Sequence, residues 1–151
     1  DLMALEELYR DVILDHYRNP RHRQPLEAPD RRAEGVNPLC GDEVTVELKM
    51  DGDRVVDVAV HGQGCSISQS SGSMMSEAIK GKTRAEIEAI AAKFHSMMTA
   101  EDETAAGLDP SRPGAVLGDL EALQGVRRYP VRIKCAALPW TTLEEALGPA
   151  G

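Results

Sequence analysis

The chain has 151 residues, a formal net charge of −8, 42% hydrophobic residues and only 3% aromatic residues. This length fits one domain over 1–151, with a single core of aliphatic side chains and methionine. The negative charge argues against nucleic acid and anionic membrane surfaces as partners, because both attract a basic face.

The first half of the chain predicts one helix followed by a hairpin. Apolar side chains recur at helical spacing over residues 2–18, and an Asn-Pro pair then stops the pattern. The polar, proline-containing segment 19–38 predicts a long loop with a short edge strand near Val36. Apolar residues alternate over 44–48, an Asp-Gly-Asp turn follows, and a second apolar run covers 55–61. These features predict an antiparallel hairpin.

The second half predicts mainly helices. One apolar stripe runs from Ile67 to Ala78, and Gly81 is placed to end that helix. Thr83–Glu86 has the pattern of a capping box, which predicts a further helix reaching Met98. Strands come first and helices mostly after, an order that favours an α+β fold. We expect a small antiparallel sheet of about three strands with helices packed on one face.

The segment 101–125 has a different composition. Its first part is acidic and rich in Gly and Pro, which predicts an exposed insertion, and residues 117–123 predict a short helix within it. Pro130 begins the final unit, which contains the run VRIKCAALPW. Thr141–Glu144 is expected to cap a last short helix.

The cysteine count indicates metal or thiol chemistry. No apolar run approaches the about 20 residues of a membrane-spanning helix, and the acidic, amphipathic first residues are unlike a secretory signal. We therefore expect a cytoplasmic protein, whose thiols stay reduced. Three cysteines are an odd number and suit a disulfide framework poorly.

Four side chains form a candidate metal site: Cys40 and Asp42 in NPLCGD, Cys65 in GQGCSIS and Cys135 in RIKCAALPW. Zinc takes four tetrahedral ligands from thiolate, imidazole and carboxylate groups. A predicted helix begins after Cys65, and a helix N-terminus favours the thiolate form. The four ligands together carry more negative charge than zinc neutralises, and Arg132 and Lys134 could supply compensating charge. The spacing matches no short zinc-finger pattern, so a shared site and three unrelated thiols both remain open.

Several other side chains have simpler explanations. His16 and Tyr17 lie on the apolar stripe of the first helix, which predicts a packed, hydrogen-bonded pair rather than a catalytic one. His61 and His95 lie outside the cysteine motifs, and we expect neither to bind metal. The methionines between positions 74 and 98 are expected to fill the core.

The three cysteine motifs, with YRDVILDHYRNPRH near the start, resemble the iron–sulfur cluster assembly proteins of the IscU and NifU N-terminal family, and most of all the SufU branch. The resemblance covers nearly the whole chain. It implies a small antiparallel sheet with helices on one side, and a site at an exposed end where Cys40, Asp42, Cys65 and Cys135 meet. Lys134 stands where the IscU branch has a histidine, and the Leu-Pro-Pro-Val-Lys segment of that branch is not found. The insertion and the Arg-Ile-Lys before Cys135 are SufU-like features.

The resemblance implies a zinc-binding sulfur acceptor. Its donor would be a SufS-like, pyridoxal phosphate-dependent cysteine desulfurase, and the sulfur would pass to a downstream scaffold or apo-protein. Cys40 is the expected acceptor because it lies in a bendable loop. A side chain of the partner would replace Cys40 as a zinc ligand and so free its thiolate. Asp42 is a weak oxygen ligand, which would make this exchange easier. Arg132 would help to dock the donor or steady the site's charge.

Two alternatives remain open at this stage. The same ligands could build a transient [2Fe–2S] cluster, which would make the protein a scaffold. The chain could also be a purely structural zinc-binding module that bridges other proteins without thiol chemistry.

Overall fold

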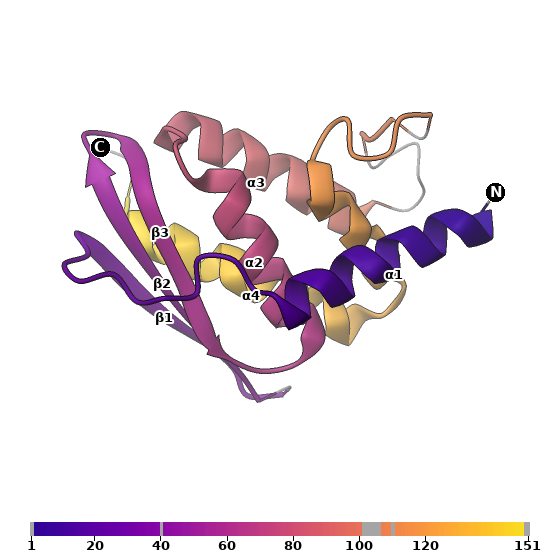
Figure 1. The fold of residues 1–151 in the computed structure, drawn as a ribbon, viewed down its shortest axis with the longest axis horizontal. Helices are drawn as coiled ribbons and strands as arrows, with labels where there is room; N and C mark the ends of the chain where they lie inside the picture. The colour runs from indigo at the N-terminus through magenta and orange to yellow at the C-terminus, as the bar shows by residue number, and fades with distance from the viewer. Residues whose placement is uncertain (1, 40, 101–106, 110, 150–151) are drawn as a thin grey trace.

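The computed structural model describes residues 2–39, 41–100, 107–109 and 111–149. The strands are β1 (Arg31–Asn37), β2 (Asp42–Asp51) and β3 (Arg54–Gln63), and the helices are α1 (Leu2–Arg18), α2 (Ser66–Ile79), α3 (Arg84–Thr99), the 3₁₀ helix η1 (Gly118–Arg128) and α4 (Pro130–Leu147). Figure 1 shows the three strands on one side of the molecule and the helices gathered against one face of the sheet. The predicted α+β class is confirmed.

The sheet has the order β1-β2-β3, and both strand pairs are antiparallel. In this register Val46 lies opposite Ala33 on one side and Val60 on the other. The edge strand β1 begins at Arg31, so it is longer than the short strand predicted near Val36. Its sequence RRAEGVN has little apolar alternation, and it is a strand because β2 offers it a backbone edge to pair with.

Small residues let α2 pack closely into the middle of the fold. Five of its serines are buried, and a Cβ added at Gly72 would lie 2.9 Å from Val60 Cγ1 on β3. The hydroxyl of Ser71 donates to the carbonyl of Ala136 on α4 at 2.6 Å. This bond fixes the start of α4 against α2 and thereby sets the position of the neighbouring Cys135.

The final helix is continuous, and the expectation that Thr141–Glu144 caps a separate helix is wrong. Helix α4 passes through Pro139, which cannot donate a backbone hydrogen bond. The side chains of Trp140 and Leu143 are buried, and Trp140 stacks on Phe94 with ring centroids 4.9 Å apart. Burial of these apolar side chains offsets the missing hydrogen bond and keeps the helix intact.

The second part of the predicted insertion lies in the core. Residues 101–106 and 110 are outside the described part of the chain, but Leu117, Leu120 and Leu123 are buried. The buried carboxylate of Glu121 accepts three backbone N–H groups, from Gly114 at 2.9 Å, Val116 at 3.0 Å and Leu117 at 2.9 Å. The expectation of an exposed segment over 101–125 is therefore wrong at Leu117 and over 120–123, because η1 carries an apolar face that the polar composition conceals.

Two further predictions concern the helices. The capping box is confirmed, since Thr83 Oγ1 accepts from the Glu86 amide at 3.3 Å and Glu86 Oε1 accepts from the Thr83 amide at 3.0 Å. The four methionines between positions 74 and 98 are buried, as predicted. Within the described residues, no helix combines the length and apolarity needed to cross a membrane.

Candidate metal centre

Three of the four predicted ligands meet at one end of the sheet. Asp42 is the first residue of β2, Cys65 precedes α2, and Cys135 lies in the second turn of α4. One ligand atom from each lies within 4.8 Å of the other two. Cys40 lies outside the described residues, two positions before Asp42 in the connection between β1 and β2. The structure thus brings together side chains separated by up to 93 positions.

Asp42 is the buried anchor of this cluster. Its Oδ1 accepts the Cys65 amide at 2.8 Å, and its Oδ2 lies 3.7 Å from Cys65 Sγ. The Asp42 side chain is fully buried, and no cationic side chain of the described residues pairs with it. A buried carboxylate is costly without a positive partner. One carboxylate and two sulfur atoms in contact range are also a donor set that Zn²⁺ accepts, so the residues present fit a zinc ion.

The Gly-x-Gly turn before Cys65 lets the backbone pass close to Asp42. A Cβ added at Gly64 would lie 2.3 Å from Asp42 Oδ1, and one added at Gly62 would lie 2.1 Å from the carbonyl oxygen of Glu43. Both glycines also have a positive φ, 144° for Gly62 and 155° for Gly64, which other residues rarely adopt. Glycine at these two positions therefore allows the end of β3 and the start of α2 to lie close to Asp42.

The two described thiols differ in their access to solvent. Cys65 is partly exposed and stands at the N-terminus of α2. Cys135 is fully buried, with its Sγ 3.6 Å from the Val131 carbonyl of the preceding turn. Of these two, only Cys65 can be reached by a reactant from outside without a structural change.

The two basic residues next to Cys135 lie on the surface of the protein. Arg132 and Lys134 are exposed, and neither makes an ion pair with another described residue. Arg132 instead lines a groove of about 620 Å³ between α1, η1 and the start of α4, together with Arg10, Arg127 and Arg128. We name this the arginine groove. Among the side chains that the structure describes, no acidic one lines the groove, although the whole chain carries a net charge of −8.

The sequence analysis did not identify a second group of side chains whose types can bind a metal ion. His16, Glu77 and Asp119 place one ligand atom each within 4.8 Å of one another. His16 is buried and hydrogen-bonded as predicted, but Tyr17 is 46% exposed, so the prediction of a packed pair is wrong for the tyrosine. Glu77 and Asp119 resemble ordinary solvated charges in the sequence, and no local pattern links them to His16.

Comparison with known proteins shows that the chain belongs to a known family. The family model of the NifU-like N terminal domain matches residues 8–136. The zinc-dependent sulfurtransferase SufU of Bacillus subtilis is 44% identical over 143 residues, which cover 95% of this chain and 91% of that protein. The iron–sulfur cluster assembly scaffold protein IscU of Streptococcus pyogenes is 37% identical over 146 residues, covering 97% and 86%.

A solved structure agrees with these relatives. A candidate iron–sulfur cluster assembly scaffold protein for the SUF system from Fervidobacterium islandicum AW-1 superimposes with a TM-score of 0.79 at 38% identity. The superposition covers 91% of this chain and 94% of that one.

Proposed function

Because the chain belongs to the family of the NifU-like N-terminal domain, we propose that it serves iron–sulfur cluster assembly as a zinc-binding sulfur acceptor. The expected resemblance to the IscU and NifU family and its SufU branch is confirmed by the comparisons. The observation that carries the function is the convergence of Asp42, Cys65 and Cys135 from three separated segments. A chain without this chemistry would have no need to bury a carboxylate that lacks a cationic partner beside two sulfur atoms.

Four side chains would hold the zinc ion: Cys40, Asp42, Cys65 and Cys135. Bound zinc keeps its cysteine ligands deprotonated and links the segments that carry them. The buried, hydrogen-bonded carboxylate of Asp42 fixes the start of β2 relative to Cys65, so two ligands are held in place by the fold itself.

Cys40 is the proposed sulfur acceptor. Its thiolate attacks the outer sulfur of a donor persulfide, a new S–S bond forms at Cys40 Sγ, and the donor cysteine leaves as a thiolate. Atoms and electrons balance without an added oxidant or reductant. Cys135 is unsuited to this step because it is buried, whereas the chain neighbours of Cys40, Leu39 and Gly41, are both exposed.

The proposed donor is a SufS-like, pyridoxal phosphate-dependent cysteine desulfurase in the cytoplasm. The arginine groove supports docking of an acidic surface, since its described lining contains four guanidinium groups and no carboxylate. Arg127 lines this groove, and its Nη1 is buried without a hydrogen-bond partner among the described residues. Arg132 belongs to this groove and Lys134 lies nearby in sequence, which supports their proposed roles in docking and charge support. A downstream scaffold or apo-protein would then receive the sulfur.

A second candidate function is assembly of a [2Fe–2S] cluster on the same ligands. It is favoured by the relatives that are named as IscU scaffold proteins. The colour of the purified protein separates the two functions: tightly bound, colourless zinc supports the sulfur acceptor, and a coloured, transferable cluster supports the scaffold. A purely structural zinc module, the third alternative, would transfer no sulfur at all.

Mass spectrometry after incubation with desulfurase and free cysteine tests the proposal. We expect the wild-type chain to gain the mass of one sulfur on the peptide that contains Cys40. The variant Cys40→Ala should gain none while it stays folded, and Lys93→Ala, at an exposed position of α3, should still gain it as a matched surface control. Absence of any mass gain on all three thiols of the wild-type chain would reject sulfur transfer.

A further inference from the structure

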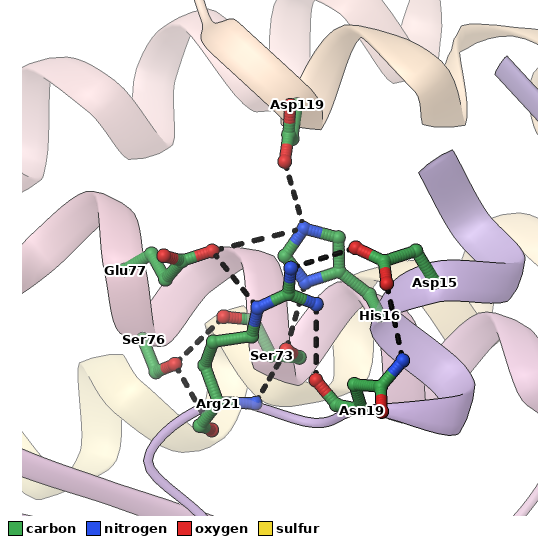
Figure 2. A network of polar contacts seen from close by, with 8 residues as sticks. All are labelled: Asp15, His16, Asn19, Arg21, Ser73, Ser76, Glu77 and Asp119. Atoms are coloured by element: carbon green, nitrogen blue, oxygen red, sulfur yellow. Dashed lines mark hydrogen bonds and ion pairs between the residues drawn. The ribbon is translucent and has the colours of Figure 1, made fainter. Parts of the chain in front are cut away.

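A second cluster of metal-binding side chains lies where α1, α2 and η1 meet (Figure 2). His16 Nε2 is 2.8 Å from Asp119 Oδ2 and 3.8 Å from Glu77 Oε1. Glu77 lies twelve positions after Cys65 on the same helix, about 18 Å along its axis at 1.5 Å per residue. This cluster is therefore separate from the cysteine site.

The imidazole is held in place from its other side. His16 is fully buried, and its Nδ1 lies 2.8 Å from Ser73 Oγ, which also accepts the backbone N–H of Arg21 at 2.9 Å. Figure 2 shows the ring between Ser73 and the two carboxylates, with Nε2 facing Asp119 and Glu77. Metal-binding histidines usually have this arrangement, in which a hydrogen bond at one nitrogen orients the other nitrogen toward the ion.

The two carboxylates can adjust to an ion. Glu77 is 48% exposed and Asp119 is 56% exposed, so both side chains can move and water can complete the coordination. Glu77 Oε1 accepts no hydrogen bond from the described residues, and its nearest nitrogen atoms lie at 3.6 Å and 3.8 Å. Metal bonds of about 2.1 Å place neighbouring ligand atoms about 3 Å apart. The three ligand atoms here already lie within 4.8 Å of one another, so each pair has to close by at most about 1.8 Å.

The local charge suits a divalent cation. With a neutral imidazole, Glu77 and Asp119 leave two negative charges at the site. The nearest cation, Arg21, is shared between Asp15 and the cluster: its Nη2 donates to Asp15 Oδ2 at 2.7 Å, and its Nε lies 3.6 Å from Glu77 Oε1. That contact with Arg21 lowers the pKa of Asp15, so the two groups stay charged and balance each other. One guanidinium therefore faces the carboxylates of Asp15, Glu77 and Asp119, and negative charge remains in excess at the cluster.

From these contacts we propose that His16, Glu77 and Asp119 bind one divalent transition-metal ion of the Mn²⁺ or Fe²⁺ type. One imidazole nitrogen with two carboxylate oxygens is a harder donor set than the thiolates of the cysteine site, so the two sites select different ions. The ion would also tie together three helices whose ligands lie up to 103 positions apart in the sequence.

Titration with Mn²⁺ tests this site in the full, zinc-loaded chain. Free Mn²⁺ has an electron paramagnetic resonance signal that falls on binding, and we expect one equivalent to bind the wild-type protein. Each of the variants Asp119→Asn and Glu77→Gln should weaken binding at least tenfold. Glu88→Gln, which neutralises an exposed carboxylate on α3, should leave it unchanged. Circular dichroism and zinc content confirm that each variant is folded.

The position of the bound ion gives a second readout. Mn²⁺ should broaden the ring signals of His16 in NMR spectra before it affects signals from residues around Cys65. Equal Mn²⁺ affinity in Asp119→Asn and the wild type would overturn the proposal, as would unbroadened His16 signals or the absence of any bound equivalent. In each of those cases, His16 and its carboxylates form only a hydrogen-bonded link between helices. Sulfur transfer is measured separately, so failure here leaves the cysteine site unaffected.

Discussion

The contact between Gly64 and Asp42 gives a sharp test of how the cysteine site is built. In Gly64→Ala the new Cβ would lie 2.3 Å from Asp42 Oδ1 and 2.9 Å from Asp42 Cγ. Asp42 is buried and accepts the Cys65 amide through that same oxygen. The carboxylate therefore cannot turn away from the methyl group without losing its hydrogen bond. The φ of 155° at Gly64 adds strain for any residue with a side chain.

The expected cost is the sum of two effects. Backbone strain of this kind costs about 1–3 kcal/mol. Loss of a hydrogen bond to a charged group costs about 1.5–3 kcal/mol. We expect Gly64→Ala to lower the free energy of unfolding by about 3–5 kcal/mol. Zinc affinity should fall about 10–100-fold, as it does when the support of a metal ligand is disturbed.

Urea unfolding of zinc-loaded and chelated protein measures the first effect, and competition with a chromogenic chelator measures the second. Gly125→Ala is the matched control, because its Cβ meets no heavy atom within 4 Å and its φ is not positive. Gly52→Ala, with a φ of 63° and open space around it, isolates the effect of a positive φ. In an Asp42→Ala background, the cost of Gly64→Ala should fall by at least about 1 kcal/mol. The reasoning is refuted if that cost does not change, or if Gly64→Ala behaves like Gly52→Ala.

Three further predictions concern stability. Glu121→Gln should lower the free energy of unfolding by about 2–3 kcal/mol, because the carboxylate is buried and accepts three backbone N–H groups; a urea midpoint equal to that of the wild type would contradict this. Thr83→Ala removes the side-chain half of the capping box and should cost about 1 kcal/mol by thermal unfolding, whereas Thr83→Ser should cost little. Gly35→Ala places a Cβ 2.1 Å from Thr142 Oγ1, on a side chain that is buried and bonded to its own helix, and should cost about 1–3 kcal/mol in urea unfolding. That last cost should shrink in a Thr142→Ala background, and an unchanged value would show that β1 can move away from α4.

Local patterns in the sequence predicted those elements whose cause is local. The apolar periodicities predicted α1, α2 and α3, and the alternation over 44–48 predicted the hairpin of β2 and β3. The capping box of Thr83 and Glu86 could also be predicted from the sequence, because its two partners lie three residues apart. The family resemblance was carried by short motifs around the cysteines, which needed no knowledge of the fold.

Tertiary structure decided the features that local patterns cannot express. Strand β1 is polar and exists because β2 offers it an edge, and η1 is buried because Leu120 and Leu123 face the core. Helix α4 continues through Pro139 because residues before and after the proline, such as Ala136 and Trp140, are buried in the core.

The cysteine site shows most clearly which features the sequence determines and which the fold determines. The sequence by itself determined which residue types could bind zinc, since donor chemistry belongs to the side chain alone. Only the fold decided that Asp42, Cys65 and Cys135 lie within 4.8 Å of one another, and that His16 faces Glu77 and Asp119. The physical reason is that such contacts depend on the packing of whole helices and strands, which joins residues with no short-range relation in the chain.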